Sequence, residues 1–193
     1  MKKILIITLC SFIFIPLIAS AEVKQEAKAK EPTTKLEAFL AKKGKILIKD
    51  FYSLGGVTSH QESGVDITAL VIYEPGQESQ KIRGLKIEVK ETTEIERSET
   101  VFLDLEEIES LSKGIDYMIN LLAKWKDETK EYTEVAFSTK GGFNIGFYQT
   151  GNTQGAFASI GEIGPIVCKF SSVEDLNKIK TMADKGLQLL NQK

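Results

Sequence analysis

Residue types that carry catalysis are sparse in this chain of 193 residues, which contains one histidine and two cysteines. His60 would have to be the base in every Ser-His-Asp or Cys-His arrangement. It lies in a polar segment with Glu62 and Asp66, so a metal site can be drawn from these three side chains. The segment lacks the second histidine at helical spacing that would support a zinc site. We therefore interpret His60 as an exposed loop residue and expect no metal.

Pairs of carboxylates, which serve as general acid and base in many enzymes, occur at Glu106 with Glu107 and at Glu94 with Glu96. The first pair falls in the opening turn of an expected helix, where acidic side chains offset the helix dipole. The second pair falls on an expected hairpin that faces solvent. Neither position indicates a catalytic cleft, so we predict that the chain is not an enzyme.

Glycine pairs occur at Gly55 with Gly56 and at Gly141 with Gly142. Neither pair has the phosphate-loop pattern or opens a helix, so both are predicted to be turns and no cofactor is expected. Gly114 stands inside an expected helix, where glycine costs about 1 kcal/mol relative to alanine. Close packing of that helix on a sheet is the preferred explanation, and a functional kink is the alternative.

An uncharged strand face is the strongest candidate for a binding surface. Between residues 142 and 149, apolar residues alternate with small or polar ones, which predicts a strand with two different faces. Phe143, Ile145 and Phe147 form the expected core face, and Asn144, Gly146 and Tyr148 form the opposite face. This second face is either a protein-docking surface or a surface packed within the molecule, and packing is the more common outcome for such a face.

The N-terminus has the three parts of a cleavable secretory signal peptide. It begins with Lys2 and Lys3, continues with an apolar run over residues 4–18, and reads Ala-Ser-Ala at residues 19–21. The run is interrupted by Ser11 and Pro16 and is shorter than the roughly 20 residues that span a bilayer, which disfavours an uncleaved anchor. We expect cleavage of residues 1–21 and export to the periplasm or the cell exterior, with no transmembrane segment left afterwards.

Cleavage would change both the charge and the cysteine chemistry of the protein. It removes Cys10 and two lysines, so the formal net charge falls from −2 to −4. An acidic chain is not expected to bind nucleic acid through electrostatic attraction. Cys168 would remain alone, which precludes an intrachain disulfide, and the alternation around it favours a buried apolar role over a nucleophilic one.

The remaining sequence divides into a tether and one domain. Residues 22–35 are charged and nearly free of large apolar side chains, which predicts a flexible tether. Residues 36–193 are expected to form a single domain that opens with a short helix over 36–43. Strands are then predicted over 45–52, 65–73, 80–91, 94–103, 132–139, 142–149, 154–160 and 165–170, with a long amphipathic helix after the fourth strand and another after the eighth.

Polar residues mark the expected start of each long helix. Asp104 with Glu107 matches a capping box, and Ser172 is the expected N-cap of the last helix. When the sequence is shifted by 68 residues, residues 104–108 align with residues 172–176. One interpretation is a β4α duplication, and the other is chance similarity of two capped helices. The predicted class is α+β, with two antiparallel four-stranded sheets braced by two amphipathic helices.

Four strands and a helix, repeated twice, is similar in strand order to the Whirly and PUR-type folds that bind single-stranded nucleic acid. Those folds use basic grooves with stacking aromatic residues, whereas lysine and glutamate intersperse on the strand between Leu85 and Lys90. A second resemblance is carried by Lys90-Glu91, Ile95-Glu96-Arg97, Phe102, Asp104, Glu107-Ile108, Ser110-Leu111, Lys113-Gly114-Ile115-Asp116-Tyr117 and Ser138-Thr139-Lys140-Gly141. Through these segments the chain resembles a group of uncharacterised exported bacterial proteins, which implies a domain family of its own and brings no activity.

These observations together predict a non-catalytic exported module, binding or structural, of the bacterial envelope. Its expected partner is an envelope or extracellular protein, with no cofactor and no nucleic acid. A periplasmic protein that binds a small ligand or lipid is the alternative. Single-stranded nucleic-acid binding is the second alternative, and it is suggested by the fold analogy alone.

Overall fold

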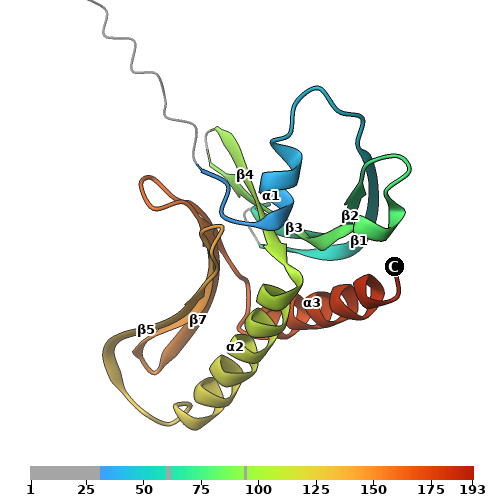
Figure 1. Ribbon diagram of the computed structural model, residues 1–193. Coiled ribbons are helices and arrows are strands. Elements are labelled where there is room, and N and C mark those ends of the chain that lie inside the picture. The colour runs from blue at the N-terminus through green and yellow to red at the C-terminus, as the bar shows by residue number, and fades with distance from the viewer. Residues whose placement is uncertain (1–30, 60–61, 94) are drawn as a thin grey trace, which may run out of the picture. The chain divides into compact units, whose positions relative to one another are not determined.

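Two antiparallel sheets and three α-helices make up the described part of the chain in the computed structural model (Figure 1). The structure describes residues 31–59, 62–93 and 95–193. The predicted signal peptide, most of the predicted tether, His60 and Glu94 lie outside these residues. The predicted α+β class with two four-stranded antiparallel sheets is confirmed. No helix among the described residues is long and apolar enough to cross a membrane.

Sheet A is a meander in which each strand pairs with the next one along the chain. Its strands are β1 (Ile48–Thr58), β2 (Gly64–Tyr73), β3 (Ile82–Thr92) and β4 (Glu96–Asp104), with a 3-10 turn at Glu78–Gln80. The alternation of residues in β3 decides which face of the sheet is buried. Leu85, Ile87 and Val89 are completely buried, whereas the charged residues between them are partly exposed.

β1 continues to Thr58, well past its predicted end at residue 52. The prediction of a turn at Gly55 with Gly56 is wrong, because both glycines lie inside the strand. A β-bulge lies between Ser53 and Gly55, and Gly55 has a φ of 120°. The extra residue shifts the alternation of side chains, so a period-two pattern did not extend through the bulge.

Sheet B repeats the meander with shorter strands. These are β5 (Lys130–Ser138), β6 (Phe143–Gly151), β7 (Thr153–Ile160) and β8 (Ile166–Lys169), again paired in chain order. The predicted turn at Gly141 with Gly142 is confirmed and joins β5 to β6. Gly142 has a φ of 88° there, a conformation that glycine adopts without a steric penalty.

The short helix α1 (Lys35–Leu40) begins one residue before its predicted start. Thr34 caps it in a reciprocal arrangement with Glu37. The Glu37 amide donates to Thr34 Oγ1 over 3.1 Å, and the Thr34 amide donates to the Glu37 carboxylate over 3.2 Å. Because Thr34 is buried, the last two residues of the predicted tether belong to the folded region.

The last helix, α3 (Asp175–Asn191), does not begin at the predicted cap. Glu174 occupies the N-cap position, and Ser172 lies before it. Ser172 Oγ accepts from the Glu174 amide over 3.1 Å, and the Asp175 carboxylate accepts from the Ser172 amide over 3.2 Å. These bonds close a tight turn that precedes the helix, so the capping chemistry is present while the helix begins later than predicted.

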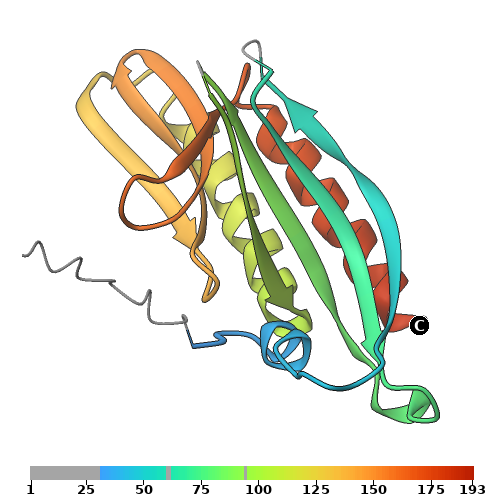
Figure 2. The same ribbon diagram turned by 90° about the horizontal axis from the view of Figure 1, so that it is seen from above.

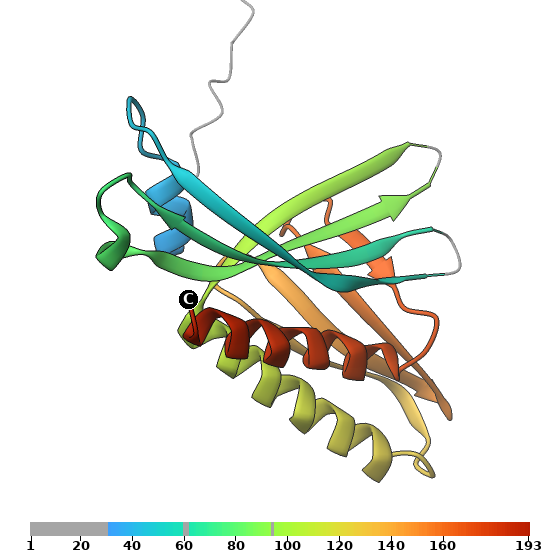
Figure 3. The same cartoon turned by 90° about the vertical axis from the view of Figure 1, so that its right-hand side faces the viewer.

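The two long helices join the sheets into one unit over residues 31–193. α3 packs on β1, β2 and β3, so the helix of the second half covers the sheet of the first half (Figure 3). α2 (Leu105–Lys124) contacts β3 and β4 of sheet A and β5 and β6 of sheet B, and it lies beside α3 (Figure 2). One continuous apolar cluster contains buried side chains from both sheets and both long helices.

Gly114 lies where α2 packs closely against β5 of sheet B. A Cβ atom on this residue would lie 2.7 Å from Cδ2 of Phe137 on β5. The contact is with the ring of a partly buried side chain that is itself packed against the core. This geometry supports the close-packing explanation of the helical glycine.

Replacing Gly114 with alanine is therefore expected to destabilise the protein, although alanine favours the helix by about 1 kcal/mol. Overpacking against Phe137 typically costs about 1–3 kcal/mol, so the free energy of unfolding should fall by up to about 2 kcal/mol once the helix gain is subtracted. Denaturant unfolding followed by circular dichroism measures the change. Ser110→Ala, on the exposed side of α2, is the control and should have little effect; a stabilised Gly114→Ala variant would contradict the packing explanation.

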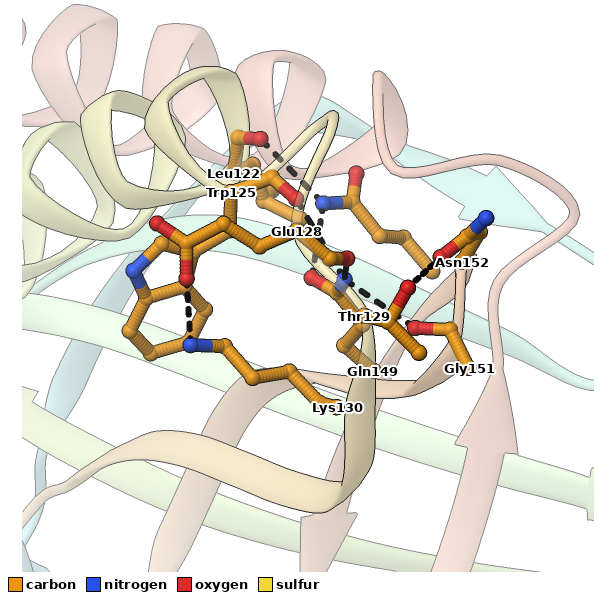
Figure 4. Close-up of polar contacts among 9 residues, drawn as sticks. Leu122, Trp125, Glu128, Thr129, Lys130, Gln149, Gly151 and Asn152 are labelled. Atoms are coloured by element: carbon orange, nitrogen blue, oxygen red, sulfur yellow. Dashed lines mark hydrogen bonds and ion pairs between the residues drawn. The ribbon is translucent and has the colours of Figure 1, made fainter.

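Two glutamine side chains from sheet B donate hydrogen bonds to carbonyl groups at the C-terminal end of α2 (Figure 4). Gln149 is completely buried, and its amide nitrogen donates to the Glu128 carbonyl, to that of Trp125 over 3.3 Å and to that of Gly151 over 3.2 Å. Gln154 donates to the carbonyl of Leu122 over 3.2 Å. Carbonyls in the last turn of a helix have no partner within the helix, so these amides stabilise its end.

Substitution of Gln149 with leucine should remove the side-chain donor of the Glu128 carbonyl and the Gln149 acceptor of the Gln154 amide, whereas the Trp125 carbonyl keeps the Glu128 amide over 3.0 Å. An unsatisfied buried acceptor costs about 1–3 kcal/mol, and a loss of stability of that size is expected. Thermal and denaturant unfolding measure it. Asn120→Leu on the exposed side of α2 serves as the control. Equal stability of both variants would show that the hydrogen bonds of Gln149 do not stabilise the end of α2.

Candidate binding surface

The outer face of sheet B carries the surface that the sequence singled out. Along β6, Phe143, Ile145 and Phe147 are fully buried, as the alternation predicted. Asn144 and Tyr148 point to the opposite side and are partly exposed. α2 contacts β5 and β6 on the inner side, and no described element lies over the outer face (Figures 1 and 2).

Two outward positions on this face are glycines, and the surrounding atoms leave no room for a side chain at either. A Cβ on Gly146 would lie 2.4 Å from the carbonyl oxygen of Val135. A Cβ on Gly155 would lie 2.5 Å from Cζ of Tyr148, its cross-strand partner. The Tyr148 ring therefore rests against the backbone of β7, where an aromatic side chain covers a glycine of the neighbouring strand.

A hollow of about 420 Å³ crosses all four strands of this face, and we call it the trough. Aromatic rings and a valine make up most of its lining, with one acidic, one basic and one hydroxyl side chain among them. The lining residues are Tyr132 and Glu134 on β5, Tyr148 on β6, Phe157 and Ser159 on β7, and Val167 and Lys169 on β8. The trough is thus built by residues from four consecutive strands, which the meander places side by side.

Two tyrosines and a carboxylate form one end of the trough. The rings of Tyr132 and Tyr148 are inclined by 22° with their centroids 6.4 Å apart, an offset-stacked arrangement. The Tyr132 hydroxyl donates to the Glu134 carboxylate over 2.8 Å. This hydrogen bond, with a smaller contribution from desolvation, raises the pKa of Tyr132 above its ordinary value, so the phenol remains a donor. Glu134 is thereby held beside two aromatic rings.

The other end of the trough is basic. Lys169 on β8 is the register partner of Phe157 on β7, and Glu134 on β5 is the register partner of Tyr148 on β6. Opposite charges therefore lie at opposite ends, with apolar side chains between them. Among the described residues, neither Glu134 nor Lys169 has an ion-pair partner.

The sequence placed only part of this surface. Tyr148 lines the trough, whereas Gly146 lies beside it and Asn144 turns toward the β5–β6 hairpin, with its amide nitrogen 3.4 Å from the Gly142 carbonyl and its Oδ1 bonded to Ser138. The other lining residues were missed, because a single strand does not reveal which residues of its neighbours stand beside it. The signal that could have identified them was their outward position in the predicted strands 132–139, 154–160 and 165–170.

Of the acidic pairs noted in the sequence, Glu106 and Glu107 form structural contacts, Glu96 is exposed at the start of β4, and Glu94 lies outside the described residues. Glu107 is buried, accepts from the Asp104 amide over 3.3 Å and accepts from the Lys140 amide over 2.9 Å. The predicted capping box is therefore confirmed. Asp104 in turn accepts from the Lys35 amide over 2.9 Å, which ties α1 to the start of α2. Glu106 is exposed and pairs with Lys35.

The metal hypothesis rested on three residues around one loop. His60 lies outside the described residues, Glu62 is exposed, and Asp66 forms an ion pair with Lys90 over 2.9 Å. Within the described ranges, no group of three or more potential metal-ligating side chains is present.

Cys168 lies in the core, completely buried on the inner side of β8. Burial, with a smaller contribution from the negative charge of Asp175, raises the pKa of its thiol to about 11. The thiolate is the nucleophilic form of cysteine, so a buried thiol with a raised pKa is a poor nucleophile. This supports the interpretation of Cys168 as a small apolar core residue.

No family model, no curated protein and no solved structure matches this chain. The described residues form an α+β fold of two four-stranded meanders. The resemblances to Whirly and PUR-type folds and to uncharacterised exported proteins remain predictions from the sequence.

Native protein is expected to protect Cys168 from alkylation. At about pH 8.5, near the ordinary thiol pKa, iodoacetamide should modify it slowly in the folded protein and rapidly in denaturant. Peptide mass mapping identifies the modified cysteine. A Ser98→Cys variant, exposed on β4, is the control for reagent access and should react in the native state. Equally fast labelling of Cys168 would contradict the assignment.

Proposed function

We propose that this chain is a non-catalytic exported binding module of the bacterial envelope, and that it docks an envelope or extracellular protein on the trough. The observation that carries the proposal is the uncovered aromatic face of sheet B. Export is supported by the three-part signal pattern of residues 1–21.

The trough has the composition of a protein-docking surface. Tyr132 is 60% exposed, and the side chains of Tyr148, Phe157 and Val167 are partly exposed beside it. Tyrosine is enriched at protein interfaces because it offers a large apolar ring together with a polar end. Clustered apolar groups on one face, bordered by charges, are typical of interaction sites rather than of ordinary surface.

The placement of the reactive groups favours binding over catalysis. Glu107 holds backbone amides, and Cys168 is enclosed in the core. In the trough, Glu134 contacts the hydroxyl of Tyr132. General acid and base catalysis requires groups that point toward a reacting atom. Here Glu107 and Cys168 stabilise the fold, and Glu134 accepts a hydrogen bond that orients an aromatic ring.

A small-ligand binding protein is the alternative, and the size of the trough favours it. A hollow of about 420 Å³ lies in the range of small-molecule sites. Native mass spectrometry of protein purified from its own envelope distinguishes the two functions. A bound compound that is released by Phe157→Ser, and no protein partner, would favour the alternative.

A pair of lysine substitutions tests the docking proposal. Asn144→Lys with Tyr148→Lys places two charges on the outer face, and cross-linking in the envelope fraction should then lose the adducts that wild-type protein forms. The expected loss is about tenfold or more, since removal of an interface aromatic side chain often costs over 1 kcal/mol.

The control is Ser98→Lys on the exposed part of β4, which should retain the adducts. Thermal unfolding of all variants shows whether the fold is intact. Unfolding of the double variant with the control intact would indicate that this face is packed within the molecule. Retained adducts on a folded double variant would place the partner elsewhere.

A further inference from the structure

We propose that the trough recognises an extended segment of the partner in which a basic, an apolar and an acidic residue occupy alternate positions. The inference rests on the proposed docking function and adds the chemistry of the partner. Charge complementarity carries it, because Glu134 and Lys169 lie at opposite ends of a trough that is lined mainly by aromatic rings and a valine. A segment with this order of side chains meets an opposite charge at each end.

The acidic end is suited to a cationic side chain. A cation near Glu134 also lies beside the rings of Tyr132 and Tyr148, whose centroids are 6.4 Å apart. Aromatic rings attract cations through their negative faces, and a neighbouring carboxylate adds an ion pair. Arginine suits both contacts, because its planar group stacks on rings and binds carboxylates.

The same combination occurs elsewhere in this protein with its own lysine. The Lys130 ammonium lies 4.6 Å from the centroid of the Trp125 ring and forms an ion pair with Glu128 (Figure 4). In the trough, Glu134 and the two tyrosines supply the carboxylate and the rings, and the partner would supply the cation. The internal example shows that this fold accommodates the geometry at a strand surface.

The basic end is suited to a carboxylate. Lys169 is exposed at the edge strand β8 and stands beside Phe157, with Val167 on the same face. An apolar side chain of the partner would cover Phe157 and Val167, and an acidic side chain would then reach the Lys169 ammonium. Opposite charges steer such a segment into one register and disfavour segments of a single charge.

The spacing follows from the geometry of the sheet. Glu134 and Lys169 are separated by three strand spacings. They are also offset by two residues along the strands, because Glu134 lies level with Gly155 on β7 and Lys169 lies level with Phe157. Their Cα atoms are therefore roughly 16 Å apart. In an extended segment, residues i, i+2 and i+4 face the same side and span roughly 13 Å, and the charged side chains cover the remainder. The recognised pattern is therefore basic-x-apolar-x-acidic.

Titration of the ¹⁵N-labelled protein with synthetic peptides tests the pattern. The main probe is acetyl-Gly-Arg-Ser-Leu-Ser-Glu-Gly-amide, and the amide signals of Gly146 and Gly155 report binding at the trough. A second probe has arginine at both charged positions, and a third has glutamate at both. A fourth probe has the composition of the main probe, with arginine and glutamate placed next to each other. Wild-type protein should bind the main probe about three- to fivefold more tightly than each other probe, as exposed ion pairs allow.

Charge reversals make the test independent of folding defects. Lys169→Glu should transfer the preference to the probe with two arginines, and Glu134→Lys should transfer it to the probe with two glutamates. Both positions are exposed, so the fold should be retained. Equal binding of all probes, an unchanged preference in either variant, or shifts away from Gly146 and Gly155 would overturn the inference. If the peptide preference is not observed while Asn144→Lys with Tyr148→Lys still abolishes partner cross-linking, the docking function stands and this inference alone is overturned.

Discussion

Burial of the inner face of sheet A under α3 is the contact on which the rest of the structure depends. Leu85 at the centre of β3 is completely buried, and its side chain lies against Gly186 of α3, where a Cβ would be 2.8 Å from a leucine methyl group. A meander with one apolar face cannot form a core alone and must pack against another element. Because the covering helix comes from the second half of the chain, neither half can complete its core without the other.

The packing of α3 on sheet A also determines where α2 and sheet B lie. α2 lies beside α3 and contacts strands of both sheets, with Gly114 allowing its close approach to Phe137. The inner face of sheet B is then used for the shared core, which includes Phe143 and Phe147. Its outer face remains for other contacts, and that is the physical origin of the trough.

Polar side chains determine the positions of the elements around this core. Asp104 and Glu107 accept backbone amides from α1 and from the β5–β6 turn, so one short segment ties together three parts of the chain. At the other end of α2, Gln149 holds the helix terminus to sheet B. Buried polar groups with complete hydrogen bonding favour a single arrangement, because any shift leaves them unsatisfied. The aromatic end of the trough, on β5 and β6, is held by these contacts.

The sequence by itself determined the local features of this protein. Alternation identified the faces of β3 and β6, and the apolar stripe and the capping pair Asp104 with Glu107 located α2. It misplaced Ser172 as the cap of α3 and interpreted Gly55 as a turn, because a tight turn and a bulge interrupt the periods on which the predictions relied. These are effects of near neighbours, which a linear pattern represents well except where the period changes.

Only the tertiary structure decided which helix covers which sheet and which residues meet on the outer face of sheet B. The sequence selected Asn144, Gly146 and Tyr148 from one strand, whereas the trough also needs Tyr132, Glu134, Phe157, Ser159, Val167 and Lys169 from three others. Register brings these residues together, and it is set by hydrogen bonding between strands and by packing of the opposite face on the core. A pattern along one strand contains no information about its neighbours' register, so the charged ends of the trough could not be read from the sequence.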